Sequence, residues 1–154
     1  MKPIAAFASQ FGAKIALNEA FVVEKAQRYY LLNPRLQRFA RNDFYYAGLY
    51  LGKVKRGVFF PSFNLLKILA DVAPNRVVVD GKAAWLFICG RDIFRKGTAK
   101  VQGSQRKGDR TLVLNEFGEC LGFGKIVSKL DVAAGNDVVV RNVLDVGDFL
   151  RREK

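Results

Sequence analysis

The sequence predicts an α+β fold in two parts. We expect residues 1–82 to form an antiparallel or mixed sheet with helices packed on one side, and residues 83–154 to form a small β-barrel. Two kinds of pattern support this division. In the first part, apolar residues at helical spacing alternate with runs of β-branched and aromatic residues. In the second part, short apolar runs follow one another across glycine-containing loops, as in small closed antiparallel sheets.

The helices of the first part are indicated by their ends. Asn33 precedes Pro34, and asparagine caps helices while proline fits the first helical turn. Ser62 offers a second cap, and Pro74 ends the apolar helical pattern that follows it. We expect, in order, strands at 21–23 and 29–32, a helix at 34–41, a strand at 44–51, a basic turn at 52–57, a strand at 58–60, a helix at 63–72 and a strand at 76–79.

The clearest pattern of the second part is a β-hairpin. Its two apolar runs are joined at 115–118, and that loop sequence closes antiparallel strands. The second part follows the turn-type tripeptide 80–82, and so short a join predicts that the two parts pack against each other. We expect, in order, a strand at 85–89, a two-turn helix at 90–97, a strand at 98–102, a basic loop at 103–109, the hairpin at 112–125, a turn of helix within 127–136 and a final strand that turns at 145–147 and runs to 152.

The balance of charges favours an anionic partner. The 26 Lys and Arg residues outnumber the 14 Asp and Glu residues, which gives a net charge of +12 and a sequence pI near 10.0. Each phosphate that such a surface neutralises releases counterions, so nucleic acid is the favoured class of partner. No apolar run approaches the roughly 18 residues that span a bilayer, and the first residues lack the sustained apolar segment of a signal peptide. We therefore expect no membrane partner and a cytoplasmic location.

The composition excludes several catalytic and metal-binding arrangements. Histidine is absent, so no histidine-based triad, general base or metal site can form. Cys89 and Cys120 are far apart in the sequence, and we expect buried thiols rather than zinc ligands. Gly122 and Gly124 lack the spacing of a phosphate-binding loop, so we expect them to permit bending or the close approach of another chain segment. The sequence predicts no catalytic residue and no cofactor.

Basic residues form clusters in the second part, and arginine matches phosphate with a planar fork of donors. These residues lie on the predicted short helix, on the basic loop and at the end of the last strand: Arg91, Arg95, Lys96, Arg106, Lys107, Arg110, Arg151, Arg152 and Lys154. Among them we expect Arg151 and Arg152 together to act in binding.

Aromatic residues gather in one segment of the first part, at Phe44, Tyr45, Tyr46 and Tyr50. Such side chains stack on bases in proteins that bind single-stranded nucleic acid. A sheet covered by helices uses the same residues as core. We expect these four residues to belong to the core.

Two patterns near the end of the sequence, at 112–125 and 138–152, resemble the PUA domain, which is named for pseudouridine synthases and archaeosine transglycosylases. The residues that match its pattern are Asn115, Glu116, Gly118, Gly124, Gly147, Asp148 and Arg151. The resemblance extends upstream to the Nip-type large-ribosomal-subunit biogenesis factors, in which a small α/β domain precedes a PUA domain. The matching upstream segments are 52–53, 58–69, 77–79, 85–90 and 90–97.

The resemblance implies an N-terminal α/β domain at 1–82, a PUA domain at 83–154, and a non-catalytic RNA-binding protein that acts in ribosome biogenesis and pre-ribosomal RNA processing. It also implies single-stranded RNA rich in U or A as ligand, an archaeal source in view of the short chain, and partners among ribosome-assembly factors or exosome components. The RNA-binding residues carried over from the family are Arg91, Arg95, Lys96, Lys100, Arg151, Arg152 and Lys154.

Two alternative interpretations stay open. An RNA-modifying enzyme, or its targeting subunit, would use the PUA domain to hold its substrate. Residues 1–82 are too few for a typical modification core, and they show no nucleophile paired with a base. A protein–protein adaptor of the RNA-processing machinery would carry an incidental basic surface. RNA affinity that falls with salt separates the RNA-binding interpretation from the adaptor.

Overall fold

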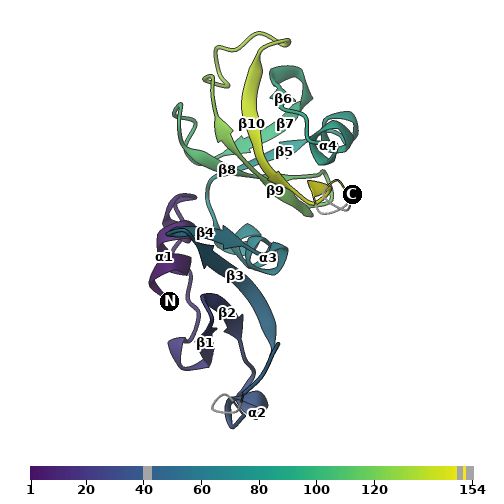
Figure 1. Cartoon of the computed structure of the whole chain (residues 1–154). Coiled ribbons are helices and arrows are strands. Elements are labelled where there is room, and N and C mark those ends of the chain that lie inside the picture. Colours follow the sequence, from purple (N-terminus) through teal and green to yellow (C-terminus); the bar gives the residue numbers. More distant parts are fainter. Residues whose placement is uncertain (40–42, 149–150, 152–154) are drawn as a thin grey trace.

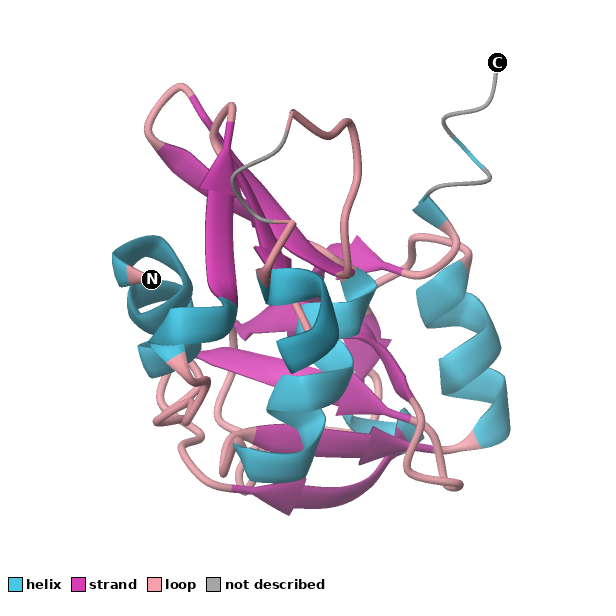
Figure 2. Ribbon diagram, turned by 90° about the horizontal axis from the view of Figure 1, so that it is seen from below, coloured by secondary structure: helices cyan, strands magenta, loops and turns pink. Residues whose placement is uncertain are grey.

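The computed structural model describes residues 1–39, 43–148 and 151, and it has two lobes (Figure 1). Each lobe is built on one sheet. The first sheet has the strand order β1-β2-β3-β4, and the second has the order β6-β10-β9-β8-β5-β7. Viewed from below, the helices flank the strands on several sides (Figure 2). The predicted α+β class is confirmed.

The first sheet is antiparallel throughout. Its strands are β1 (Val22–Lys25), β2 (Arg28–Leu31), β3 (Leu49–Lys55) and β4 (Val58–Pro61). Tight two-residue turns join β1 to β2 and β3 to β4. All four turn residues, Ala26, Gln27, Arg56 and Gly57, have positive φ, which gives these turns the twist that suits a tight hairpin.

Two predicted elements of this sheet have the wrong bounds. The strand predicted at 44–51 begins at Leu49, and most of the turn predicted at 52–57 belongs to β3. The lysines of that segment are exposed and alternate with Val54, which is partly buried. A strand whose outer face carries lysines has the same composition as a basic loop, so the sequence of this segment fits a strand and a turn equally well.

The helical segments of the first lobe are α1 (Lys2–Ser9), η1 (Glu19–Phe21), α2 (Pro34–Gln37) and α3 (Phe63–Val72). Both predicted caps are confirmed. The Asn33 side chain accepts a hydrogen bond from the Leu36 amide at 2.9 Å, and the Ser62 hydroxyl accepts one from the Leu65 amide at 3.2 Å. α2 is shorter than predicted, and residues 40–41 of the predicted helix lie outside the described residues. α1 has no counterpart among the predicted elements.

The second sheet contains one parallel pairing, between β5 and β8, among antiparallel ones. The elements of this lobe are β5 (Arg76–Val79), α4 (Gly81–Ile88), β6 (Ile93–Phe94), η2 (Arg95–Gly97), β7 (Thr98–Gln102), β8 (Arg110–Leu114), β9 (Cys120–Ile126) and β10 (Val138–Asp145). The strand predicted at 76–79 exists, but it belongs to the second sheet and not to the first. The predicted hairpin is confirmed as β8 and β9.

The region after β5 differs most from the prediction. α4 replaces the strand predicted at 85–89, and the helix predicted at 90–97 is an extended segment that ends in the 3-10 turn η2. The Asp80 side chain accepts a hydrogen bond from the Ala83 amide at 2.8 Å, so the tripeptide that indicated a turn caps a helix. A short apolar run fits a helix and a strand equally well. The helical turn predicted within 127–136 is a series of bends and turns.

The two lobes share one hydrophobic cluster. Between ring centroids, Phe7 of α1 lies 5.5 Å from Phe59 of β4 and 5.6 Å from Phe123 of β9. Phe11 lies 5.5 Å from the same Phe123 ring. The lobes therefore pack against each other, as the short join predicts. A second cluster fills the interior of the second sheet, with Val77, Val79, Phe87, Ile93, Val113, Ile126, Leu130, Val139 and Val140.

Two glycines permit the close approach of β9 and β10. Gly122 has a φ of +147°, and a Cβ atom there would lie 2.0 Å from the Leu144 carbonyl oxygen. A Cβ atom at Gly124 would lie 2.4 Å from a methyl carbon of Val140. The prediction that these glycines serve chain approach is confirmed.

Candidate nucleic-acid interface

A groove of about 340 Å³ lies between α4 and the β6–η2 segment of the second lobe. It is lined by Asp80, Lys82, Ala83, Leu86, Asp92, Phe94, Lys96 and Gly97. Leu86 and Phe94 keep 36% and 39% of their surface exposed, so the groove offers apolar and aromatic surface to a ligand. Lys82 of α4 and Lys96 of η2 add one exposed cation from each of the elements that bound it.

Backbone contacts hold the two sides of the groove together. The Asp80 amide donates a hydrogen bond to the Gly97 carbonyl oxygen at 3.0 Å, which ties the start of α4 to the end of η2. A Cβ atom at Gly97 would lie 2.6 Å from the Cβ atom of Ala83. A larger residue at either position would therefore push α4 away from η2.

The two carboxylates of the groove are engaged by the backbone. Asp80 caps α4, and Asp92 accepts a hydrogen bond from the Asn142 amide at 2.9 Å. The Lys82 ammonium group has no hydrogen-bond partner among the described residues, so it is available to an anion. The groove thus combines two carboxylates that are held by backbone amides, Asp80 and Asp92, with a lysine, Lys82, that is free to bind an anion.

Arg95 and Lys96, two of the predicted binding residues, fasten the segment 127–137 to η2. The Arg95 guanidinium donates to the Leu130 carbonyl oxygen at 2.6 Å and to the Thr98 hydroxyl at 2.7 Å. The Lys96 ammonium group donates to the Asn136 side chain at 2.9 Å and lies 6.0 Å from the centroid of the Phe94 ring. Arg95 is therefore committed to the fold, whereas Lys96 also faces the groove.

Arg91 and Lys100, also predicted, are both exposed. Arg91 follows α4 by three residues, and its carbonyl oxygen accepts a hydrogen bond from the Asn142 side chain at 3.4 Å. Lys100 lies on β7, the edge strand of the second sheet, opposite Val78 of β5. Within the part of the chain that the structure describes, neither side chain forms a hydrogen bond or ion pair, so both can reach a polyanion.

The exposed Arg151 forms an ion pair with the buried Asp145. Its two terminal nitrogens donate to the Asp145 carboxylate at 3.0 and 2.7 Å, and one of them also donates to the Ile88 carbonyl oxygen at 2.5 Å. The Asp145 residue is 1% exposed. Because the charged form of Arg151 is held by hydrogen bonds to Asp145, the pKa of Arg151 is raised. The planar fork of this arginine thus faces the protein and fastens the chain to the end of α4.

The backbone around Arg151 also differs from the prediction. β10 ends at Asp145, and the Arg151 amide donates a hydrogen bond to the Gly147 carbonyl oxygen at 3.2 Å, so Arg151 does not continue the final strand. Arg152 and Lys154, the remaining predicted binding residues, lie outside the described residues.

Lys82, Leu86 and Phe94 line the groove but were not predicted as binding residues. The signal for two of them was present in the sequence. Once Asp80 is treated as a helix cap, Lys82 and Leu86 fall four residues apart on one face of α4. The strand predicted at 85–89 placed them on unrelated faces.

The aromatic segment of the first lobe is more exposed than predicted. Tyr45 is 89% exposed and Tyr46 is also exposed, so the prediction of a core position is wrong for both. Phe44 and Tyr50 are half-buried and contact the buried Tyr30, with ring centroids 5.8 and 5.5 Å away. The chain turns outward here because β3 begins later than predicted.

The two cysteines differ in exposure. Cys89 is exposed, so the prediction of a buried thiol is wrong there, whereas Cys120 is partly buried and burial raises its pKa to about 11. The described residues contain no cluster of three or more potential metal ligands. Within the same residues, no helix has the length and apolar character needed to cross a membrane.

The second lobe, with its curled mixed sheet, capping helix and hydrogen-bonded Asp145–Arg151 pair, defines a PUA-domain protein with an additional α/β lobe. The sequence model described as the UPF0113 PUA domain matches residues 75–154. The chain therefore belongs to the UPF0113 PUA domain family, and the resemblance to the PUA domain is confirmed at that level.

Individual relatives agree with this assignment. A UPF0113 protein of Archaeoglobus fulgidus is 31% identical over 115 residues, which is 71% of this chain, and the chain spans 64% of that relative's length. A conserved PUA domain protein from Thermoplasma acidophilum is similar over 98% of this chain and 91% of that one, with a TM-score of 0.65 and 23% identity, which shows the shared fold. A PUA domain from Aeropyrum pernix K1, solved as a tartrate complex, matches 61% of this chain and 55% of that one, with a TM-score of 0.52 and 28% identity.

Proposed function

We propose that this protein binds single-stranded RNA, without catalysing a reaction, through the groove between α4 and β6–η2. The observation that carries the proposal is the combination of an exposed aromatic ring, Phe94, with Lys82 and Lys96 in one groove of a PUA domain. Aromatic stacking of bases and neutralisation of the backbone are the general means by which proteins bind single strands. In this arrangement a base lies on Phe94 while neighbouring phosphates meet the two lysines.

The other predicted basic residues take different parts in the proposal. Arg91 and Lys100 extend the basic surface beyond the groove, and Arg152 and Lys154 remain part of the proposed binding set. Arg151 acts as a positioning residue, since its guanidinium is bonded to Asp145 and to the Ile88 carbonyl oxygen at the end of α4. The preference proposed for the RNA is a U- or A-rich single strand.

We also propose that the protein is a Nip-type factor of large-ribosomal-subunit biogenesis, located in the cytoplasm. Its ligand would then be pre-ribosomal RNA, and its partners would be assembly factors or exosome components. The α/β lobe that precedes the PUA domain supports this role, because the Nip-type family has the same order of domains. We propose a domain boundary near residue 75 rather than at 82, because β5 pairs within the second sheet.

Fluorescence anisotropy with a labelled oligouridylate and a labelled oligoadenylate, each at several salt concentrations, tests the proposal. We expect log affinity to fall linearly with log salt, with a slope that reflects about four to six phosphates at roughly 0.7 each. The double substitution Lys82→Met and Lys96→Met should weaken binding and reduce that slope by about 1.4, since two phosphate contacts are lost.

Lys14→Met with Lys67→Met is the matched control, because both lysines are exposed on the first lobe and the change in net charge is the same. This control should retain most of the affinity. Equal losses for the two double variants would show that only the net charge matters and would remove the groove from the proposal. Affinity that ignored salt would contradict RNA binding through the phosphate backbone.

A further inference from the structure

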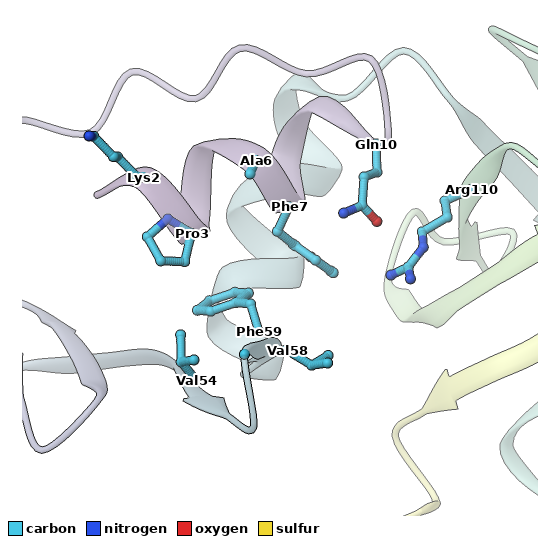
Figure 3. Close-up of a pocket in the computed structure, with 10 residues that line it drawn as sticks. Lys2, Pro3, Ala6, Phe7, Gln10, Val54, Val58, Phe59 and Arg110 are labelled. Carbon is cyan, nitrogen blue, oxygen red and sulfur yellow. The ribbon is translucent and has the colours of Figure 1, made fainter.

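A second cavity, of about 510 Å³, lies where the two lobes meet (Figure 3). It is open to solvent on one side and is bounded by α1, by the β3–β4 hairpin and by the first residue of β8, and it is separate from the groove beside α4. Its walls are Lys2, Pro3, Ala6, Phe7, Gln10, Val54, Gly57, Val58, Phe59 and Arg110. A volume of this size is typical of sites for small organic ligands, which occur preferentially between domains.

Two cations line this cavity, Lys2 near Pro3 at the start of α1 and Arg110 at the opposite end (Figure 3). The Arg110 guanidinium has no hydrogen-bond or ion-pair partner among the described residues. Arg110 is half-buried, and its guanidinium carbon lies 5.3 Å from the centroid of the Phe123 ring and 5.9 Å from that of Phe7. Burial lowers the pKa of Arg110, in keeping with the loss of water around its charge. A guanidinium carries five N–H donors, so an anion is the ligand that would satisfy this group.

The rest of the wall is divided between an apolar side and a polar side. Phe59 of the hairpin points towards Phe7 of α1, with ring centroids 5.5 Å apart, Val58 lies beside it, and Pro3 lies above Phe59 at the start of that helix (Figure 3). Gln10 lies at the end nearest Arg110 (Figure 3). None of the ten lining residues is acidic. The cavity therefore suits a ligand with an anionic end and a flat apolar end.

We propose that this cavity binds one nucleotide, with its phosphate on Arg110 and its base against Phe59 and Pro3. The guanidinium fork binds phosphate through two parallel hydrogen bonds, and the aromatic ring offers a face for stacking. Gln10 can donate to the sugar or to the base. Inorganic phosphate would satisfy Arg110 but would leave the apolar wall in contact with water.

The same chemistry fits a free nucleotide and an unpaired nucleotide of an RNA strand. The second source rests on the proposed RNA binding, whereas the first does not. The cavity lies away from the α4 groove, so each site can be lost without the other. The experiment therefore includes ligands of both kinds.

Nuclear magnetic resonance titration of the full chain, followed through backbone amides and arginine Nε–H signals, tests the site. The ligands are uridine 5′-monophosphate, uridine, inorganic phosphate and a short oligouridylate. We expect uridine 5′-monophosphate to shift the signals of Arg110 and Gln10, and to bind about tenfold or more tightly than either uridine or phosphate. A preference for the oligouridylate at these same signals would identify RNA as the source.

Two variants and a matched control define the outcome. Arg110→Met keeps an unbranched apolar side chain over the Phe7 and Phe123 rings and should weaken nucleotide binding about tenfold. Val58→Glu places a carboxylate at an exposed position of the wall, so it should repel the phosphate even if Arg110→Met fails to fold. Lys107→Met removes an exposed cation of the loop before β8 that does not line the cavity, and this variant should bind the nucleotide normally.

Absence of shifts at Arg110 and Gln10 would overturn the inference, and so would phosphate alone binding as well as the nucleotide. Shifts confined to α4 and η2 would also overturn it while supporting the RNA groove. Conversely, uridine 5′-monophosphate binding in the cavity, together with an oligouridylate titration that shifts no signal of α4, β6 or η2, would leave this inference standing and remove the proposed function. The failures of the two proposals are thus distinguishable.

Discussion

Replacing Gly147 by alanine should weaken the contacts of Arg151 and Asn142 with the end of α4. A Cβ atom at this position would lie 2.0 Å from the Ile88 carbonyl oxygen and 3.1 Å from a carboxylate oxygen of Asp145. The φ angle is not in the left-handed region, so the cost is steric. Relief requires a movement of about 1 Å, which disturbs the hydrogen bonds of Arg151 and Asn142 to the last carbonyl groups of α4. Overpacking costs about 1–3 kcal/mol, and unpaired buried polar groups cost a similar amount.

The expected loss is therefore about 2–5 kcal/mol in the free energy of unfolding, or roughly 5–15 °C in Tm for a chain of this size. Differential scanning calorimetry and urea denaturation measure it. Gly81→Ala is the matched control, because nothing lies within 4 Å of its Cβ position and its φ is ordinary. That variant should be neutral or more stable by a few tenths of a kcal/mol. If Gly147→Ala were as stable as Gly81→Ala, the close approach of Gly147 to the end of α4 would be refuted.

Two further results are expected. Phe94→Ala should weaken binding of single-stranded RNA by about 1–3 kcal/mol, the usual value of one stacked base. The control Phe117→Ala removes an exposed ring at the tip of the hairpin and should leave the affinity unchanged. Equal losses of affinity for the two variants in fluorescence anisotropy would contradict stacking in the groove. Burial raises the pKa of Cys120 from 9.0 to about 11, so the Cys120 thiol stays protonated to a higher pH in the folded state than in the unfolded state. Stability should then be full below pH 9 and fall by about 2–3 kcal/mol as the pH rises towards 11. Cys120→Val should remove this part of the pH dependence in denaturant titrations, and an unchanged profile would contradict burial as its cause.

The sequence identified elements whose signals are local. Asn33 and Ser62 cap helices because their side-chain oxygens accept from amides three residues on, and that chemistry is visible in the sequence. Gly122 and Gly124 were placed correctly because glycines within a strand pattern indicate close approach. The β8–β9 hairpin followed from a loop between two apolar runs.

The elements that the sequence misassigned depend on contacts distant in the chain. The run at 85–89 is apolar in both a strand and a helix, and the surroundings of α4 decide between them. Asp80 acts as a cap and not as a turn residue, which changes the face on which Lys82 lies. The groove itself needs η2 beside α4, and the contact of Gly97 with Ala83 has no local signal.

The role of each candidate arginine also depends on contacts that are distant in the sequence. Charge alone suggested Arg151 as a ligand for phosphate, but a buried carboxylate, Asp145, holds the same donors. A sequence pattern shows that an arginine is present but not which acceptor it meets. Arg110 is the reverse case, since its lack of an acceptor among the described residues becomes visible only in three dimensions.

If both proposed sites bind RNA, the contact of Phe123 with Phe7 and Phe11 limits the length of RNA that can reach from one to the other. A shared cluster of rings, and not a free linker, sets the distance between the groove beside α4 and the cavity beside α1. An RNA strand that contacts both sites therefore binds without the entropic cost of ordering two domains relative to each other. A strand too short cannot span the gap, and a longer one must loop out at an entropic cost that grows with its length. The fixed arrangement of the two lobes would in this way select the number of nucleotides between the two that are bound.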